Sequence, residues 1–278
     1  MDLTLLCDNT TITDRYFLGE PGISFLIRDG PTGVLFDLGY SDIFLRNAMA
    51  MGETLLEIER VVFSHAHLDH TWGLLPLLRH LNGAVIEGRP HTRPGYLAHP
   101  AIFRHISAAG LPEIGMPMGE DDLRRQGEVH LSREPVAITD DLHFLGEIPR
   151  RFSFEEGHTV GECDGRPDTV PDDTALAYAS EDGVVVITGC AHAGICSTVE
   201  YAREVCGEER VAAVIGGFHL LDASEERINE TYRYFRNLSP GRIYPCHCTG
   251  LPAIIALAGS CRVGEAGVGL SLSFAPRP

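Results

Sequence analysis

Hydrophobic positions along the chain change between a two-residue and a helical period, and this predicts alternating strands and helices. Strands are expected at residues 22–29, 33–39, 60–64, 174–179, 183–188, 211–215, 242–244 and 268–274. Helices are expected at residues 41–51, 72–81 and 197–205, and from residue 222 onward. Because strands and helices alternate in both halves, the pattern is typical of an α/β sandwich.

Turn and capping residues set the ends of several of these elements. Asp29-Gly30-Pro31-Thr32 predicts a hairpin turn, and Gly52 and Gly83 are expected to end the first two helices. The last helix is expected to start at Asp222, with Glu225 three residues later as a capping-box-like signal. The residues of this helix expected to face inward are Ile228, Tyr232 and Phe235.

Residues from about 88 to 150 are less regular, and among their aromatic and histidine residues they carry Pro90, Pro94, Pro100, Pro112 and Pro117. We interpret this stretch as an insertion that forms a lid or contacts substrate. The chain shows no internal repeat and no linker with a clear change of composition. Residues 1–278 are therefore expected to form one domain that carries this insertion.

The formal net charge of −17 disfavours general binding to nucleic acid or to anionic membranes, but leaves room for a small anionic substrate. No apolar run approaches the roughly 20 residues of a membrane helix. The start of the sequence lacks the pattern of a signal peptide, so a cytoplasmic location is expected. The chain has no lysine, which excludes Schiff-base lysine chemistry. The oligomeric state is not readable from the sequence.

The strongest chemical signal is the run His65-Ala66-His67-Leu68-Asp69-His70, directly after a predicted strand. Imidazole and carboxylate groups are the ligands that zinc, iron and manganese take from proteins. Four such groups within six positions, in a turn that enters a helix, point into one small volume. The run therefore predicts a metal site.

This run resembles the H-x-H-x-D-H motif of the metallo-β-lactamase superfamily, which implies a four-layer αββα sandwich. The resemblance implies that His65 and His67 bind one metal ion and that Asp69 and His70 bind a second. The two divalent ions are expected to be zinc, with iron and manganese as alternatives. Asp37 matches the aspartate that orients the histidine turn in this superfamily, although a strand-end aspartate is also common in ordinary turns.

Further ligands are expected after three predicted strands of the second half. These segments are Gly189-Cys190-Ala191-His192, Gly216-Gly217-Phe218-His219 and Pro245-Cys246-His247-Cys248. Because they follow strands that are expected to end at one sheet edge, their side chains should converge. By resemblance, His247 is the final histidine of the superfamily and binds the second metal.

The remaining ligand of the first metal has two candidate alignments. One uses His158, with Cys190 as a bridging ligand. The other uses His192, with Cys190 and His219 nearby.

Several segments resemble more closely a subgroup described as dihydropterin-ribofuranosyl-aminobenzene phosphate synthase-like, from residue 3 to about residue 273. They are Asp8-Asn9-Thr10, Gly146-Glu147-Ile148-Pro149-Arg150, Asp172-Asp173-Thr174-Ala175-Leu176, Gly189-Cys190-Ala191-His192, Gly216-Gly217-Phe218-His219 and His247-Cys248-Thr249-Gly250. A Gly-Cys-x-His motif is characteristic of this subgroup, so the resemblance favours His192.

Three other features have more than one interpretation. His219 is expected to bind substrate, to donate a proton, or to bind metal, in that order. At least one of Cys246 and Cys248 is expected to be simply buried, a common fate of free cysteine. The pair Asp172-Asp173 fits a turn better than a catalytic pair.

These observations favour a metal-dependent hydrolase of a small phosphorylated or ester substrate, because two metal ions can generate hydroxide from water near neutral pH. Asp69 and His219 are the expected catalytic residues, as proton acceptor and proton donor. The subgroup implies a second hypothesis, a transferase that joins a dihydropterin methyl diphosphate to a ribosyl-aminobenzene phosphate. A third is a di-iron redox protein, although such superfamily members usually carry Glu where this chain has His67. A fourth is a metal-dependent binding module without turnover.

Overall fold

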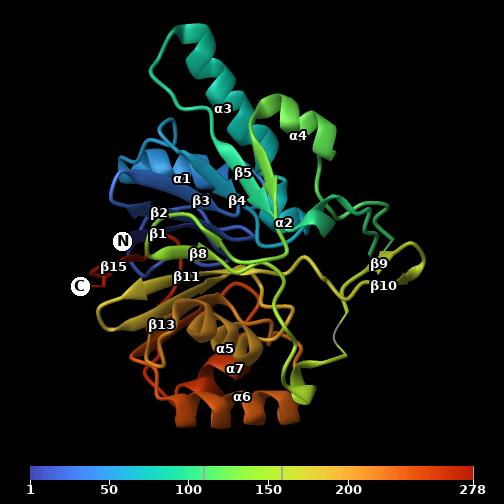
Figure 1. The fold of residues 1–278 in the computed structure, drawn as a ribbon, viewed down its shortest axis with the longest axis vertical. Coiled ribbons are helices and arrows are strands. Elements are labelled where there is room, and N and C mark those ends of the chain that lie inside the picture. The colour runs from blue at the N-terminus through green and yellow to red at the C-terminus, as the bar shows by residue number, and fades with distance from the viewer. Residues whose placement is uncertain (109, 158, 278) are drawn as a thin grey trace. The chain divides into compact units, whose positions relative to one another are not determined.

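The computed structural model describes residues 1–108, 110–157 and 159–277, and most of its strands form two mixed sheets, one in each of two compact units (Figure 1). Unit 1 comprises residues 1–132, 160–168 and 267–273. Unit 2 comprises residues 133–159, 169–266 and 274–278. Both units are thus assembled from segments far apart in the sequence. The expectation that residues 1–278 behave as one domain stays a prediction.

The sheet of unit 1 has, among the described residues, seven strands in the order β15-β1-β2-β3-β4-β5-β6. They are β1 (Asp2–Cys7), β2 (Ser24–Asp29), β3 (Thr32–Phe36), β4 (Arg60–Val62), β5 (Gly95–Ala98), β6 (Val129–Leu131) and β15 (Ser271–Ser273). The pairs from β3 to β6 are parallel, whereas the pairs from β15 to β3 are antiparallel. The carboxyl ends of β3 and β4 therefore lie at the same edge of the sheet.

The helices of unit 1 cover this sheet. Along the chain they lie between its consecutive parallel strands. They are α1 (Ile43–Met51), α2 (Leu68–Thr71), α3 (Leu74–Glu87), the 3-10 helix η1 (Pro100–Phe103) and α4 (Glu120–Gln126). Figure 1 shows α1 and α3 on the same side of the strands. Their apolar faces, including Phe44, Leu74 and Leu77, join one buried core with Leu35 and Val61 of the sheet. A short hairpin, β9 (Glu162–Cys163) with β10 (Arg166–Pro167), completes the unit.

The sheet of unit 2 has six strands within the described part of the chain, in the order β14-β13-β12-β11-β8-β7. They are β7 (Val136–Ala137), β8 (Leu142–Phe144), β11 (Ala175–Ser180), β12 (Gly183–Thr188), β13 (Val211–Gly217) and β14 (Arg242–Cys246). The pairs β12–β13 and β13–β14 are parallel. Because parallel strands end at one edge, the three segments expected to supply ligands leave the sheet together.

Helices α5 (Ile195–Cys206), α6 (Glu225–Leu238) and α7 (Leu251–Leu257) lie on one side of the sheet of unit 2 (Figure 1). The 3-10 helix η2 (Ser153–Glu155) precedes β9 in the chain. Val199, Phe235 and Leu257 from the three long helices share a buried core with Val186 and Val214 of the sheet. This core is distinct from the core of unit 1.

Most elements predicted from the sequence are present, and four details were wrong. Helix α3 continues through Gly83 and ends at Gly88, which adopts a left-handed conformation with φ 65°. Helix α6 is capped by Ser224, whose Oγ accepts a hydrogen bond from the Arg227 amide, and not by Asp222. A cap that satisfies this amide outweighs the weaker capping-box pattern. The other two errors concern the inward face of α6 and the stretch 88–150.

The face of α6 that points inward is shifted from the predicted one. Phe235 is buried as expected, but the other fully buried positions are Arg227 and Thr231, whereas Ile228 and Tyr232 are only half-buried. The Thr231 hydroxyl donates to the Arg227 carbonyl oxygen, so this polar residue is satisfied inside the helix. A prediction from hydrophobicity alone therefore placed the inward face of α6 one position away from the observed one.

Residues 88–150 are not an irregular insertion. They contribute β5 and β6 to the sheet of unit 1, and β7 and β8 to the sheet of unit 2. These strands have only two to four residues each, which is too short for a clear alternation in the sequence. Pairing with neighbouring strands, not local pattern, stabilises them. No helix in the described part of the chain is both long and apolar enough to span a bilayer.

Candidate metal centre

The His65–His70 segment of unit 1 places two imidazole nitrogens about as far apart as two ligand atoms bound to the same metal ion. His65 follows β4, His67 is the N-cap residue of α2, and Asp69 and His70 lie within that short helix. The Nε2 atom of His65 lies 3.0 Å from the Nδ1 atom of His67. Ligand nitrogens on one tetrahedral zinc ion are about 3.3 Å apart, so this pair fits a shared cation.

The protonation state of His67 suits the same role. Burial lowers the pKa of His67 to about 4, because removal of water disfavours the charged ring, while the nearby Asp69 carboxylate opposes this shift. At neutral pH the ring is therefore neutral and has a nitrogen lone pair available for a cation. The donor set of unit 1 fits a divalent metal ion.

Asp37 orients two of these histidines, His70 by direct contact and His65 through the Ser64 hydroxyl. Its Oδ2 atom lies 2.7 Å from His70 Nδ1, and it accepts a 2.6 Å hydrogen bond from the Ser64 hydroxyl. The Ser64 oxygen in turn lies 2.8 Å from His65 Nδ1. These contacts place a proton on Nδ1 of both rings and leave both Nε2 atoms for a metal ion. The expectation that Asp37 orients the histidine turn is confirmed.

The backbone at Asp37 is shaped for this contact. Asp37 follows β3 directly and has a left-handed conformation with φ 58°, which non-glycine residues rarely adopt. Its Oδ1 atom also accepts a 2.7 Å hydrogen bond from the Ser64 amide, so the carboxylate joins the ends of β3 and β4. This backbone strain is compensated by three hydrogen bonds to a buried carboxylate.

Asp69 is more exposed than the histidines beside it. Its side chain is 27% exposed, and its Oδ2 atom lies 3.8 Å from His70 Nε2. Two of the three donors predicted for the second metal, Asp69 and His70, therefore lie side by side in unit 1. The partial exposure leaves the Asp69 carboxylate accessible to water.

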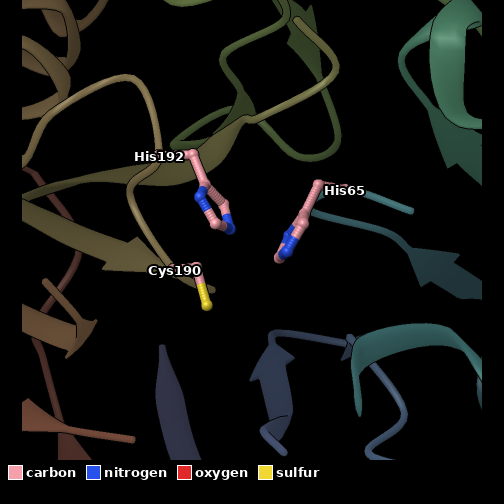
Figure 2. Close-up of side chains that lie close together, drawn as sticks. All are labelled: His65, Cys190 and His192. Atoms are coloured by element: carbon pink, nitrogen blue, oxygen red, sulfur yellow. The ribbon is translucent and has the colours of Figure 1, made fainter. Parts of the chain in front are cut away.

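In unit 2, donor atoms gather around Cys190. The Sγ atom of Cys190 lies within 4.8 Å of ring nitrogens of His192, His219 and His247, and within 4.8 Å of Cys248 Sγ. The rings of His192 and His219 have centroids 4.1 Å apart. Figure 2 shows Cys190 and His192 on the loop that follows β12, and His65 on the segment that follows β4. Unit 2 thus unites the three ligand-bearing segments predicted from the sequence.

The loops that carry these donors share an unusual backbone conformation. Ala191, His219 and His247 have φ angles of 52–53°, in the left-handed region. Each lies within three residues of the end of a strand, β12, β13 or β14. Strained residues at the same edge of a sheet are a feature of functional sites, because the surrounding contacts must hold them.

Asp173 and Arg150 hold the His192 loop through its backbone. The buried Asp173 Oδ2 atom accepts a 2.7 Å hydrogen bond from the Ala193 amide, and the carboxylate also accepts from the His192 amide. Arg150 donates a 2.9 Å hydrogen bond to the His192 carbonyl oxygen. Burial raises the pKa of Asp173 to about 7, although these amides oppose the shift. The Asp173 amide donates to the Val170 carbonyl oxygen and closes a turn ahead of β11, so the interpretation of Asp172-Asp173 as a turn is confirmed, and the Asp173 carboxylate also holds the His192 loop.

Comparison with known proteins decides the family. Residues 19–247 match the family model described as the metallo-beta-lactamase superfamily. This chain belongs to the metallo-β-lactamase superfamily. Its mixed sheets and helices match the α/β sandwich fold of that superfamily, so the fold predicted from the sequence is confirmed. Members of this superfamily generally bind divalent metal ions.

Individual relatives of this superfamily member differ in the activities that their names state. A 7,8-dihydropterin-6-methyl-4-(beta-D-ribofuranosyl)-aminobenzene-5'-phosphate synthase from Methanocaldococcus jannaschii is 34% identical over 255 residues, which are 85% of this chain and 83% of that protein. The solved structure of Tm1679, a metal-dependent hydrolase of the β-lactamase superfamily, is 27% identical and covers 99% of both chains with a TM-score of 0.81. The metallo-β-lactamase fold protein YhfI from Bacillus subtilis is 12% identical, covers 98% of both chains with a TM-score of 0.59, and shows the fold alone.

The structure also shows what the sequence interpretation missed. Cys248 lies beside Cys190 and His219, although the two cysteines around His247 gave no reason to prefer one of them. Cys246 is buried at the end of β14, as expected for one of the pair. His158 lies outside the described residues, so the choice between His158 and His192 stays a prediction.

Proposed function

We propose that this chain is a metal-dependent hydrolase that acts on a small phosphorylated or ester substrate. The observation that carries the proposal is the 3.0 Å approach of His65 Nε2 to His67 Nδ1. Ser64 and Asp37 hold the Nδ1 atoms of His65 and His70, so the Nε2 atoms of both rings are oriented to bind a cation. A structural cluster of histidines would not need this support.

Each unit supplies donors for divalent metal ions. Unit 1 would contribute His65, His67, Asp69 and His70, and unit 2 would contribute His192 and His247, in agreement with the resemblance. We propose two ions, and zinc as the metal, because both sets contain imidazole donors and unit 1 adds the Asp69 carboxylate. Ions of this kind acidify water and polarise a phosphoryl or carbonyl oxygen.

Asp69 and His219 are the residues proposed to move protons. Asp69 is 27% exposed and can accept a proton from a water molecule that attacks the substrate. His219, held in a left-handed conformation beyond β13, would donate a proton to the leaving group. We propose a small anion as the substrate, because the net charge of −17 disfavours large anionic partners such as nucleic acid or a membrane.

A transferase is the second candidate, and the named synthase among the relatives favours it. That protein is 34% identical over most of this chain, and its name states synthesis of a ribofuranosyl-aminobenzene phosphate product. The corresponding reaction would join a dihydropterin methyl diphosphate to a ribosyl-aminobenzene phosphate and release pyrophosphate. Both reactions take place next to a phosphate group, so the same donors could support either.

The experiment compares the two reactions on one metal-loaded preparation. Purified protein is reconstituted with zinc, then incubated with bis(p-nitrophenyl) phosphate or with the two transferase substrates. Release of p-nitrophenol supports the hydrolase, and pyrophosphate release only when both pterin and aminobenzene substrates are present supports the transferase. Metal content is measured in parallel, and iron without zinc would favour the di-iron redox alternative.

Variants make this experiment specific to the proposed residues. We expect His67→Ala and Asp69→Ala to lose bound metal and turnover together. The matched control is His130→Ala, because His130 is exposed on β6 of the same unit. If metal binding changed ligand affinity without turnover of any substrate, the chain would instead be a binding module.

A further inference from the structure

Two cysteine side chains and one histidine side chain of unit 2 form a cluster that the six proposed ligands do not include. The Sγ atoms of Cys190 and Cys248 and a ring nitrogen of His219 all lie within 4.8 Å of one another. Ligand atoms on one tetrahedral zinc ion are about 3.3–3.8 Å apart, depending on whether nitrogen or sulfur is bound. Small side-chain rotations would therefore bring the three atoms into coordination distance.

We propose that Cys190, His219 and Cys248 bind a thiophilic divalent metal ion through two thiolates and one imidazole. The proposal deepens the proposed function, because it makes sulfur part of the metal chemistry of this chain, but it rests on unit 2 alone. His219 would bind the ion through one ring nitrogen, and the N–H of its other ring nitrogen would remain the proton donor proposed above. Thiolate ligands select zinc, cadmium and cobalt over magnesium, calcium and manganese. With two thiolates, this site would bind zinc, cadmium or cobalt in preference to magnesium, calcium or manganese.

The backbone around Cys248 is arranged as expected around a coordinating sulfur atom. The His219 amide donates a 3.3 Å hydrogen bond to Cys248 Sγ, and the Cys248 thiol lies 3.6 Å from the Cys190 carbonyl oxygen. The amides of Leu220 and Leu221 both donate to the Cys248 carbonyl oxygen. Amide hydrogens directed at sulfur stabilise its negative form, and this network fixes Cys248 relative to the β13 loop.

Gly217 makes this approach possible. A Cβ atom at Gly217 would lie 2.6 Å from Cys248 Sγ and 3.3 Å from the Cys190 Cα atom, and it would also collide with the Gly189 carbonyl oxygen. The space beside Gly217 is thus filled by the cysteine sulfur. Only glycine lets the ends of β12, β13 and β14 come this close.

The test is absorption spectroscopy of the full-length protein, freed of metal and titrated with Co²⁺. Bonds between cobalt and thiolate give a charge-transfer band in the near ultraviolet, which nitrogen and oxygen ligands do not give. We expect this band in the unmodified protein. Each of Cys190→Ser and Cys248→Ser should reduce its intensity by about half, because each variant removes one of two thiolates. The matched control Cys246→Ser, at the end of β14 and two residues before Cys248, should leave the band unchanged.

A missing band in the unmodified protein, or a full band in Cys248→Ser, would overturn the proposal. If Cys190→Ser fails to fold, X-ray absorption of the zinc-loaded unmodified protein replaces it. A sulfur shell would then support the proposal, and a shell of nitrogen and oxygen alone would refute it. The proposed function is tested by turnover and fails independently, since a protein could show the band without activity or activity without the band.

Discussion

The Oδ2 atom of Asp37 lies 2.7 Å from Nδ1 of His70, and both side chains are fully buried. The two residues are 33 positions apart, one directly after β3 and the other inside α2. The contact directs the opposite nitrogen of His70, Nε2, toward the side that carries Asp69. A carboxylate behind a histidine increases the basicity of the ring and fixes its orientation.

Asp37→Asn should therefore weaken metal binding without unfolding the chain. The amide tolerates the left-handed backbone, but it cannot accept from Ser64 and His70 with the strength of a carboxylate. We expect metal affinity to fall by about 10–100-fold, measured by competition with a chelator of known affinity. Asp42→Asn is the control, because Asp42 is exposed and forms no side-chain cap with α1. Unchanged affinity in Asp37→Asn would show that Asp37 does not support the site.

The choice between His192 and His158 can be decided by a pair of substitutions. His192→Ala should reduce the amount of metal retained after dialysis, because its ring lies near Cys190 among the donors of unit 2. His158→Ala should retain close to the normal amount. Metal content measured by mass spectrometry on both proteins is the check, and the reverse ranking would favour the other alignment.

Asp173 should act on the site through the His192 loop. Asp173→Ala removes the acceptor of the buried Ala193 amide, and an unsatisfied buried amide costs about 1–3 kcal/mol. We expect a matching decrease in the free energy of unfolding, measured in urea, together with faster hydrogen exchange at Ala193. Asp173→Asn keeps an acceptor oxygen and should recover part of the loss. Asp182→Ala, in the exposed turn between β11 and β12, is the control.

Two glycine substitutions should have opposite effects on stability. Gly217→Ala would force its Cβ against Cys248 Sγ and is expected to destabilise the protein by about 1–3 kcal/mol. Gly83→Ala lies within α3, where a Cβ would meet open space, and should stabilise the protein by about 0.5–1 kcal/mol. Thermal unfolding of the two variants provides the comparison. A neutral Gly217→Ala would contradict the close packing around Cys248.

The single-domain prediction can be tested by following unfolding with two probes. The sole tryptophan, Trp72, reports on unit 1, whereas circular dichroism reports on the strands and helices of both units. Each unit is built from segments that the other interrupts, which favours joint unfolding. We expect the two transitions to coincide in urea. A second transition visible only by circular dichroism would show that unit 2 unfolds on its own.

The sequence by itself determined the elements whose information is local. The hairpin β2–β3 and the hairpin β11–β12 could be predicted because short apolar runs flank clear turn sequences. The donors from His65 to His70 could be predicted together because six consecutive positions after a strand need no distant contact to meet. The resemblance to a known superfamily extended this local information to the whole chain.

Only the tertiary structure decided which distant side chains meet. Cys248 reaches Cys190, 58 positions earlier, because three parallel strands end at one edge and Gly217 leaves room between them. Asp173 reaches Ala193 across 20 residues that include a complete hairpin. The short strands β5 and β6 are stable only because neighbours supply their hydrogen bonds. Such contacts depend on pairing over long distances in the chain, which hydrophobic periodicity and residue type do not encode.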